Sequence, residues 1–335
     1  MKTVMLTAEQ TDEAAAIIRN GGLVAVPTET VYGLAADALN GKAVAKIFQA
    51  KGRPMDNPLI VHIAELSQID MLVSEFPEKA RILAEKFWGG PLTVILPKSD
   101  QVPVEVSGGL DTVAVRMPSN PIAREVILKS SPLAAPSANL SGSPSPTNAK
   151  HVFDDMNGRI DAIIDGGESD VGVESTVISL AVNPPRLLRP GGITVEQLRE
   201  AIGEVVIDDA VINPLRSGEK AASPGMKYKH YSPKANVILL KGNGDLFLRY
   251  VNSHSGENTA VLSYEEENGK ILCECINIGR SDDYKTQARR LFTSLRKADE
   301  GGFQTVYAHC PEKQGVGLAL YNRMIRAAGF EVIEL

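Results

Sequence analysis

Residues 51–63, KGRPMDNPLIVHI, join a cationic loop to an apolar strand. Lys51 and Arg53 stand one residue apart, directly after a short helix that the pattern predicts over residues 42–50. A mobile ammonium beside a planar guanidinium suits a polyphosphate, although such cations more often belong to a solvated surface loop. His62 interrupts the strand. A strand histidine is more often a satisfied core residue than a ligand-binding one, but the nearby cations favour a site.

The first 205 residues predict a compact α/β domain. Thr7, with Gln10 three residues later, predicts the N-cap of a first helix, and residues 29–38, which lack any period, predict a loop. Hydrophobic patterns predict strands at residues 23–28, 59–63, 92–97 and 112–118, and helices at residues 77–88, 121–129 and 194–203. Because these elements alternate without a regular βαβ rhythm, we expect a twisted mixed sheet with an open concave face.

The remainder predicts a linker and a smaller domain. Residues 206–235 contain little regular pattern but carry lysine, histidine and tyrosine side chains between prolines, so this linker could reach into a site. Over residues 236–335, strands alternate with helices, which predicts a small, mainly parallel, Rossmann-like sheet. No G-x-G-x-x-G follows its first strand and no P-loop motif occurs in the chain, so neither motif indicates a nucleotide site here.

Composition narrows the class of protein. The chain has 335 residues, 43% of them hydrophobic and 23% charged, which is typical of a globular protein of two domains. No apolar run is long enough for a membrane span. Three cysteines are an odd number and too few for a disulfide framework, so we expect a cytoplasmic protein. Residues 1–205 carry a net charge of −7, which disfavours a protein built mainly to grip nucleic acid.

Polar residues on other segments complement the cationic loop. Arg116 lies on a strand face that it shares with small residues, so it belongs either to a solvated edge or to an anion site. The serines and Asn139 of residues 135–147 (APSANLSGSPSPT) could cradle phosphate, although serine-rich loops are usually only loops. Ser175 and Arg189 are likewise a short polar residue and a cation that lie close to glycines in the sequence. No catalytic triad or carboxylate pair stands out, which leaves catalysis by positioning and charge.

Seven segments in combination resemble a known family. They are PTETVYGLAADA (27–38), K-x-R-P-x-x-N-P-L-x-x-H (51–62), DTVAVRMP (111–118), APSANLSGSPSPT (135–147), ESTV (174–177), RPGG (189–192) and SPGMKYKHYSP (223–233). Together they are similar to the long, two-domain form of the YrdC-like threonylcarbamoyl-AMP synthases. The resemblance implies synthesis of L-threonylcarbamoyladenylate from L-threonine, bicarbonate and ATP, with release of pyrophosphate, for threonylcarbamoyladenosine modification of tRNA. The product would pass to a tRNA threonylcarbamoyl transferase.

The resemblance also implies roles for individual residues. The catalytic K-x-R … S-x-N tetrad, which would hold the ATP phosphates and the Mg²⁺ that they carry without direct protein ligands to the metal, corresponds to Lys51, Arg53, Ser137 and Asn139. Further ATP contacts correspond to Asn57, Thr112, Ser145, Arg189 and, in the linker, Tyr231, with Tyr228 as the alternative. Threonine contacts correspond to Thr30, His62, Arg116, Ala135 and Ser175, with Tyr32 beside them.

Two other functions compete with this interpretation. A YrdC-like domain could be a non-catalytic RNA-binding module, but the acidic charge and the lack of interleaved basic and aromatic residues disfavour it, and direct tRNA binding stays open. Carbamoyl transfer of the hydrogenase-maturation type would need acylphosphatase-like and zinc-finger segments, which the chain lacks.

Overall fold

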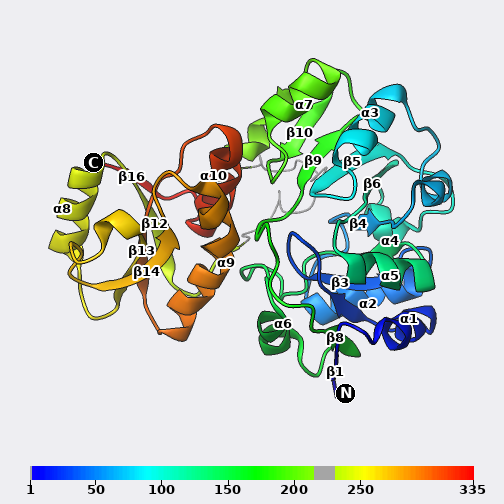
Figure 1. Ribbon diagram of the computed structural model, residues 1–335, viewed down its shortest axis with the longest axis horizontal. Helices are drawn as coiled ribbons and strands as arrows, with labels where there is room; N and C mark the ends of the chain where they lie inside the picture. Colours follow the sequence, from blue (N-terminus) through cyan, green and yellow to red (C-terminus); the bar gives the residue numbers. More distant parts are fainter. Residues whose placement is uncertain (1, 215–230) are drawn as a thin grey trace. The chain divides into compact units, whose positions relative to one another are not determined.

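The computed structural model describes residues 2–214 and 231–335, and the chain divides into two compact units (Figure 1). Unit 1 comprises Met1–Ser141 and Ser145–Lys227, and unit 2 comprises Gly142–Pro144 and Tyr228–Leu335. Within the described parts of the chain, no helix has the length and apolar character needed to cross a membrane.

Unit 1 is built on a mixed sheet. Its described elements are β1 (Val4–Leu6), α1 (Thr11–Arg19), β2 (Val24–Val26), β3 (Gly33–Asp37), α2 (Gly41–Lys51), β4 (Ile60–His62), η1 (Leu66–Met71), α3 (Glu78–Phe87), β5 (Leu92–Pro97), α4 (Val104–Ser107), β6 (Thr112–Arg116), α5 (Pro121–Lys129), β7 (Leu133–Ala134), α6 (Ala149–Met156), β8 (Ala162–Ile164), β9 (Thr176–Ser179), β10 (Arg186–Arg189), α7 (Val195–Ile202), β11 (Val206–Ile207) and η2 (Asp209–Val211). The strand order is β1-β8-β2-β3-β7-β4-β6-β5-β9-β10-β11.

The register of four central strands positions the polar residues of unit 1. β4 and β6 are parallel, with His62 opposite Arg116, and β5 runs antiparallel to β6, with Thr93 opposite Arg116. Directly opposed residues project from the same face of a sheet. The three side chains therefore share one face, where the C-terminal ends of β4 and β6 meet the beginning of β5. β9 pairs with β5 from Leu92 and Thr176 onward, which places Ser175 at the same end.

Unit 2 has a parallel sheet with helices on both faces. Its described elements are β12 (Asn236–Lys241), α8 (Gly244–His254), β13 (Thr259–Tyr264), η3 (Glu265–Glu267), β14 (Glu274–Gly279), α9 (Tyr284–Glu300), β15 (Thr305–His309), α10 (Gly315–Ala327) and β16 (Val332–Glu334). Every strand pair described in this unit is parallel, in the order β14-β13-β15-β12-β16. Figure 1 shows α8 on one side of this sheet and α9 and α10 on the other.

Two local predictions for unit 1 were wrong. Thr7 does not cap the first helix, because Gln10 occupies the N-cap position and its side chain instead accepts a hydrogen bond from the Thr7 N–H in a preceding turn. Residues 29–38 are only partly a loop, because β3 pairs antiparallel with both β2 and β7. Both faces of β3 are covered, so small apolar residues suffice there and no alternation appears in the sequence.

The predictions for the start of α7 and for the linker have different outcomes. The predicted capping box of Thr194 and Gln197 is confirmed at the start of α7. Within the stretch predicted as a linker, β11 pairs with β10 and η2 follows it, and both belong to unit 1. Tyr228 and the other residues of 215–230 lie outside the described residues.

Gly191 lets the turn after β10 cross closely over the start of β9. A Cβ at this position would lie 2.3 Å from the Thr176 nitrogen and 2.6 Å from the Glu174 oxygen, both of them backbone atoms that cannot rotate away. Residue 191 must therefore lack a side chain for Arg189 and Ser175 to approach each other.

We expect Gly191→Ala to lower the free energy of unfolding of unit 1 by about 2 kcal/mol or more, because overpacking against backbone forces a shift of the turn. Urea unfolding followed by the fluorescence of Trp88, the only tryptophan in the sequence, measures this unit. The matched variant Gly89→Ala places its Cβ at ordinary contact distances of 3.6 Å and beyond, so it should change stability little. Equal effects of the two variants would contradict the expectation.

Candidate functional site

The candidate site begins with Arg116 at the C-terminal end of β6. Its side chain is buried, and each of its three nitrogens donates to a protein acceptor: Nε to the Gly90 carbonyl at 3.3 Å, Nη1 to the Thr30 hydroxyl at 2.8 Å, and Nη2 to the Glu29 carboxylate at 2.5 Å. Thr30 in turn lies 2.8 Å from the Thr28 hydroxyl. The predicted pair Thr30 and Arg116 therefore meets in the folded chain, and Glu29 joins it although the sequence analysis did not select it.

Ser175 and Arg189 form a second group at the same end of the sheet. Arg189 donates from Nε to the Ser175 carbonyl at 2.9 Å and from Nη2 to the Ser175 hydroxyl at 3.0 Å. The Thr93 hydroxyl lies 2.7 Å from the same hydroxyl. Since Thr93 is opposite Arg116 in the sheet register, this group adjoins the first one. Thr93 is a second participant that sequence reasoning missed, because a lone threonine in an apolar strand carries no distinguishing signal.

His62 is an uncharged side chain in this polar cluster. Its imidazole is buried, and the pKa falls to about 3, mainly because burial disfavours the charged ring and next because Arg116 lies close. Nδ1 lies 3.3 Å from the Ile60 carbonyl oxygen. A neutral ring can offer a hydrogen bond at physiological pH without adding a third positive charge beside Arg116 and Arg189.

Lys51 holds the serine-rich loop in place. It ends α2, and its ammonium donates to the carbonyls of Ser137 at 2.5 Å and Asn139 at 2.6 Å, while the Ser141 N–H donates back to the Lys51 carbonyl. Burial, and then the neighbouring Arg53, hold the Lys51 pKa well below its usual value. Lys51 thus contacts two other residues of the tetrad, Ser137 and Asn139, through their backbone carbonyls.

Arg53 and Asn57 lie at the beginning of β4. The Arg53 guanidinium donates to the carbonyls of Asn57 and Pro58, so the cationic loop folds back on itself. The Asn57 Oδ1 atom is buried and, among the described residues, has no hydrogen-bond partner. Thr112 begins the adjacent parallel strand β6, four residues before Arg116. At about 3.3 Å per residue, the two ends of β6 are about 13 Å apart, so Thr112, predicted to contact the nucleotide, and Arg116, predicted to contact the amino acid, lie at opposite ends of one strand.

The other predicted residues lie in the same unit with one exception. Ser145 donates a hydrogen bond to Glu174, the buried neighbour of Ser175. Ala135 is buried, and its N–H bonds to the Ile60 carbonyl. The Tyr32 hydroxyl donates to the Gly167 carbonyl at 2.7 Å and accepts from the Gly166 N–H, and burial raises its pKa to about 12.

Tyr231 is the exception, because it belongs to unit 2. There its ring packs on Phe292, with centroids 5.3 Å apart, and the Arg323 guanidinium lies over it at 5.3 Å. Its contact with a nucleotide therefore stays a prediction.

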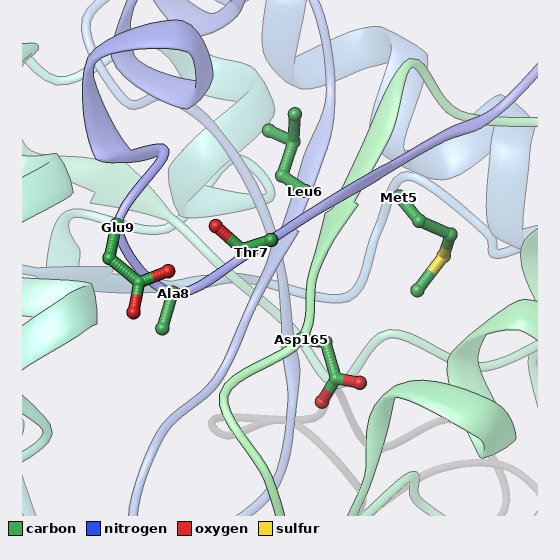
Figure 2. Close-up of a pocket in the computed structure, with 6 residues that line it drawn as sticks. All are labelled: Met5, Leu6, Thr7, Ala8, Glu9 and Asp165. Carbon is green, nitrogen blue, oxygen red and sulfur yellow. The ribbon is translucent and has the colours of Figure 1, made fainter.

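A surface pocket of about 430 Å³ lies elsewhere in unit 1, beside β1. Figure 2 shows its lining, in which the charged side chains are the carboxylates of Glu9 and Asp165 (Figure 2). None of the predicted site residues lines it. Two carboxylates without a cation do not suit a phosphate, so this pocket is distinct from the candidate site.

The fold and the site together define an α/β protein that buries three arginines, a lysine and short hydroxyl side chains around one set of central strands. Comparison with known proteins identifies the family. Residues 16–191 match the family model described as "Telomere recombination", named for Sua5, YciO and YrdC, and residues 193–329 match the model described as "Threonylcarbamoyl-AMP synthase, C-terminal domain".

Relatives match almost the whole chain. The threonylcarbamoyl-AMP synthase of Pyrococcus abyssi is 48% identical over 332 residues, covering 96% of this chain and 95% of that protein. The synthase of Bacillus subtilis is 47% identical, covering 97% and 94%. The crystal structure of P. abyssi Sua5 complexed with L-threonine matches with a TM-score of 0.93 and 46% identity, covering all of both chains. The protein belongs to the threonylcarbamoyl-AMP synthase family.

The buried neutral His62 makes stability sensitive to acid. The histidine of the unfolded chain binds a proton at its ordinary pKa of about 6.5, whereas His62 of the folded chain binds one only near pH 3. The free energy of unfolding therefore decreases as the pH falls from about 6.5 toward 3. Between about pH 7 and pH 4.5, we expect the free energy of unfolding of His62→Gln to fall by about 2 kcal/mol less than that of the wild type. Urea unfolding at both pH values, followed by Trp88 fluorescence, measures the difference, and equal losses would contradict it.

Proposed function

We propose that the protein makes L-threonylcarbamoyladenylate from L-threonine, bicarbonate and ATP and releases pyrophosphate. The observation that carries this proposal is the strand register, which groups Arg116, His62 and Ser175 at one end of β4 and β6, while Arg53 stands at the other. The names of the relatives support it, and so does the threonine complex of the archaeal relative.

Threonine occupies the Arg116 end of the strands. A guanidinium binds a carboxylate well, and Arg116 is held in place by Thr30 and Gly90. The neutral ring of His62 and the hydroxyls of Thr30 and Ser175 provide hydrogen bonds suited to the threonine hydroxyl. Ala135 and Tyr32 contribute buried walls to the threonine site, Ala135 from beside Ile60 at the start of β4 and Tyr32 from beside the serine-rich loop.

ATP occupies the opposite end, against the cationic loop and the serine-rich loop. Lys51, Arg53, Ser137 and Asn139 hold the phosphates, and the Mg²⁺ ion enters with them as part of the nucleotide substrate. A polyphosphate beside Lys51 favours the charged ammonium that burial disfavours. Additional nucleotide contacts come from Asn57 and Thr112 at this end and from Ser145 and Arg189, which bond to Glu174 and Ser175 beside the threonine end. A contact from Tyr231 is a separate prediction.

Positioning and charge neutralisation then account for the reaction. The threonine ammonium first gives up a proton, and the amine adds to the carbon of bicarbonate, from which a water molecule leaves, so that the N-carboxylate forms. An oxygen of that carboxylate attacks the α-phosphorus of ATP, the bond from the α-phosphorus to the bridging oxygen breaks, and pyrophosphate leaves. Lys51 and Arg53 stabilise the charge that builds on the leaving group, and no protein nucleophile takes part.

The product of the proposed reaction implies a partner enzyme. A labile mixed anhydride requires a transferase that moves the threonylcarbamoyl group to adenosine in tRNA, and this chain need not bind tRNA itself. The division of labour that we propose is catalysis by residues 1–205 together with β11 and η2, a linker within the rest of residues 206–235, and a separate role for residues 236–335. Three free cysteines support a reducing, cytoplasmic setting.

We expect threonine to stimulate pyrophosphate release from ATP in the presence of Mg²⁺ and bicarbonate, and alanine to stimulate it far less, because alanine lacks the hydroxyl that the polar cluster binds. Pyrophosphate is measured by a coupled enzymatic assay, with threonine but no bicarbonate as the control. Release that is equal with threonine and with alanine would refute the proposed activity.

Lys51→Ala should reduce the rate of threonine-dependent pyrophosphate release by at least about 100-fold, because a preorganised cation beside the leaving group is lost. The matched variant Lys150→Ala removes an exposed lysine that pairs with Asp154 on α6, and it should retain the wild-type rate. Circular dichroism checks that both variants fold. A folded Lys51→Ala protein with normal turnover would remove this residue from the mechanism.

A further inference from the structure

Glu29 carries a buried carboxylate oxygen that no described residue satisfies. The side chain lies between β2 and β3 and is only 7% exposed. Its Oε1 atom accepts from Arg116, whereas Oε2 is buried and, across residues 2–214 and 231–335, has no hydrogen-bond partner. A buried charged oxygen without a donor is unfavourable, so this position calls for a donor from a ligand.

Hydrogen bonds fix the backbone on both sides of Glu29. The Val171 N–H donates to the Glu29 carbonyl at 2.7 Å, and the Tyr32 N–H donates to the Pro146 carbonyl at 2.9 Å. The Thr28 hydroxyl donates to the Val31 carbonyl at 2.6 Å and closes the turn. Because the backbone is fixed and Oε1 is bonded to Arg116, Oε2 is a preorganised acceptor.

Arg116 retains donors beside this acceptor. A guanidinium has five N–H groups, and the described protein acceptors use one on each nitrogen. One N–H remains on each of Nη1 and Nη2, so Arg116 can bind a carboxylate without releasing Glu29. The two side chains then present unused positive and negative groups next to each other, with no net charge.

We propose that Glu29 Oε2 binds the α-ammonium of the amino-acid substrate while Arg116 binds its α-carboxylate. This inference rests on the proposed function and adds a binding residue to it. An arginine alone would favour any small carboxylate. An arginine paired with a half-satisfied carboxylate favours a zwitterion, because an ammonium both donates to the second oxygen and matches its charge.

The test compares L-threonine with 3-hydroxybutanoate, which is threonine without its amino group. Isothermal titration calorimetry of the full-length protein should show that L-threonine binds at least about 10-fold more tightly than 3-hydroxybutanoate. This is the ratio of affinities expected for one hydrogen bond to a charged group. In Glu29→Gln, which keeps an oxygen for Arg116 but loses the negative charge, the ratio of the two affinities should fall toward one. Glu168→Gln changes an exposed carboxylate on a nearby loop and should keep the wild-type ratio.

Two results would overturn the proposal. One is equal affinity of the wild type for both ligands, a comparison that stands even if Glu29→Gln fails to fold. The other is a folded Glu29→Gln protein that binds both ligands more weakly by the same factor, because Glu29 would then only neutralise Arg116. The failure of the proposed function is a distinct result: the wild type would neither bind threonine nor release pyrophosphate in response to it.

Discussion

The ion pair between Arg116 and Glu29 is the interaction on which the arrangement of the site depends. A buried guanidinium is costly unless charge and hydrogen bonds compensate it, and here a carboxylate, a hydroxyl and a backbone carbonyl do so. These three partners come from the β2–β3 connection and from the turn before β5. Burying Arg116 therefore ties together segments that are distant in the chain and joins them at the end of β6.

The rest of the site follows the same physical rule, in which burial is tolerated because polar partners are supplied. Lys51 is satisfied by two carbonyls of the serine-rich loop, and Arg189 by the backbone and side chain of Ser175. His62 meets the cost differently, because it gives up its charge. The result is a set of groups whose positions are fixed by protein hydrogen bonds, which is what a reaction driven by orientation and charge requires.

Much of the candidate site could be read from local sequence because its motifs are compact. Lys51, Arg53 and Asn57 fall within seven residues, and Ser137 and Asn139 share one short loop. Glu29 could have been found, since it lies between two threonines of the PTETVYG segment, but a glutamate in a loop is ordinarily solvated. Thr93 could not, because its role exists only through its position opposite Arg116. The N-cap assigned to Thr7 failed because a turn and a helix start share the same local signals.

The sequence by itself determined the α/β class, the parallel second sheet, the family and most of the polar residues, because apolar periodicity and short motifs are local properties of the chain. Only the tertiary structure decided that β3 is a strand, that His62, Thr93 and Arg116 share one face, and that Glu29 is half satisfied. Strand register and burial arise from contacts between segments far apart in sequence. Strand register and burial cannot be read from any local sequence pattern, and they bring the separate motifs together in one site.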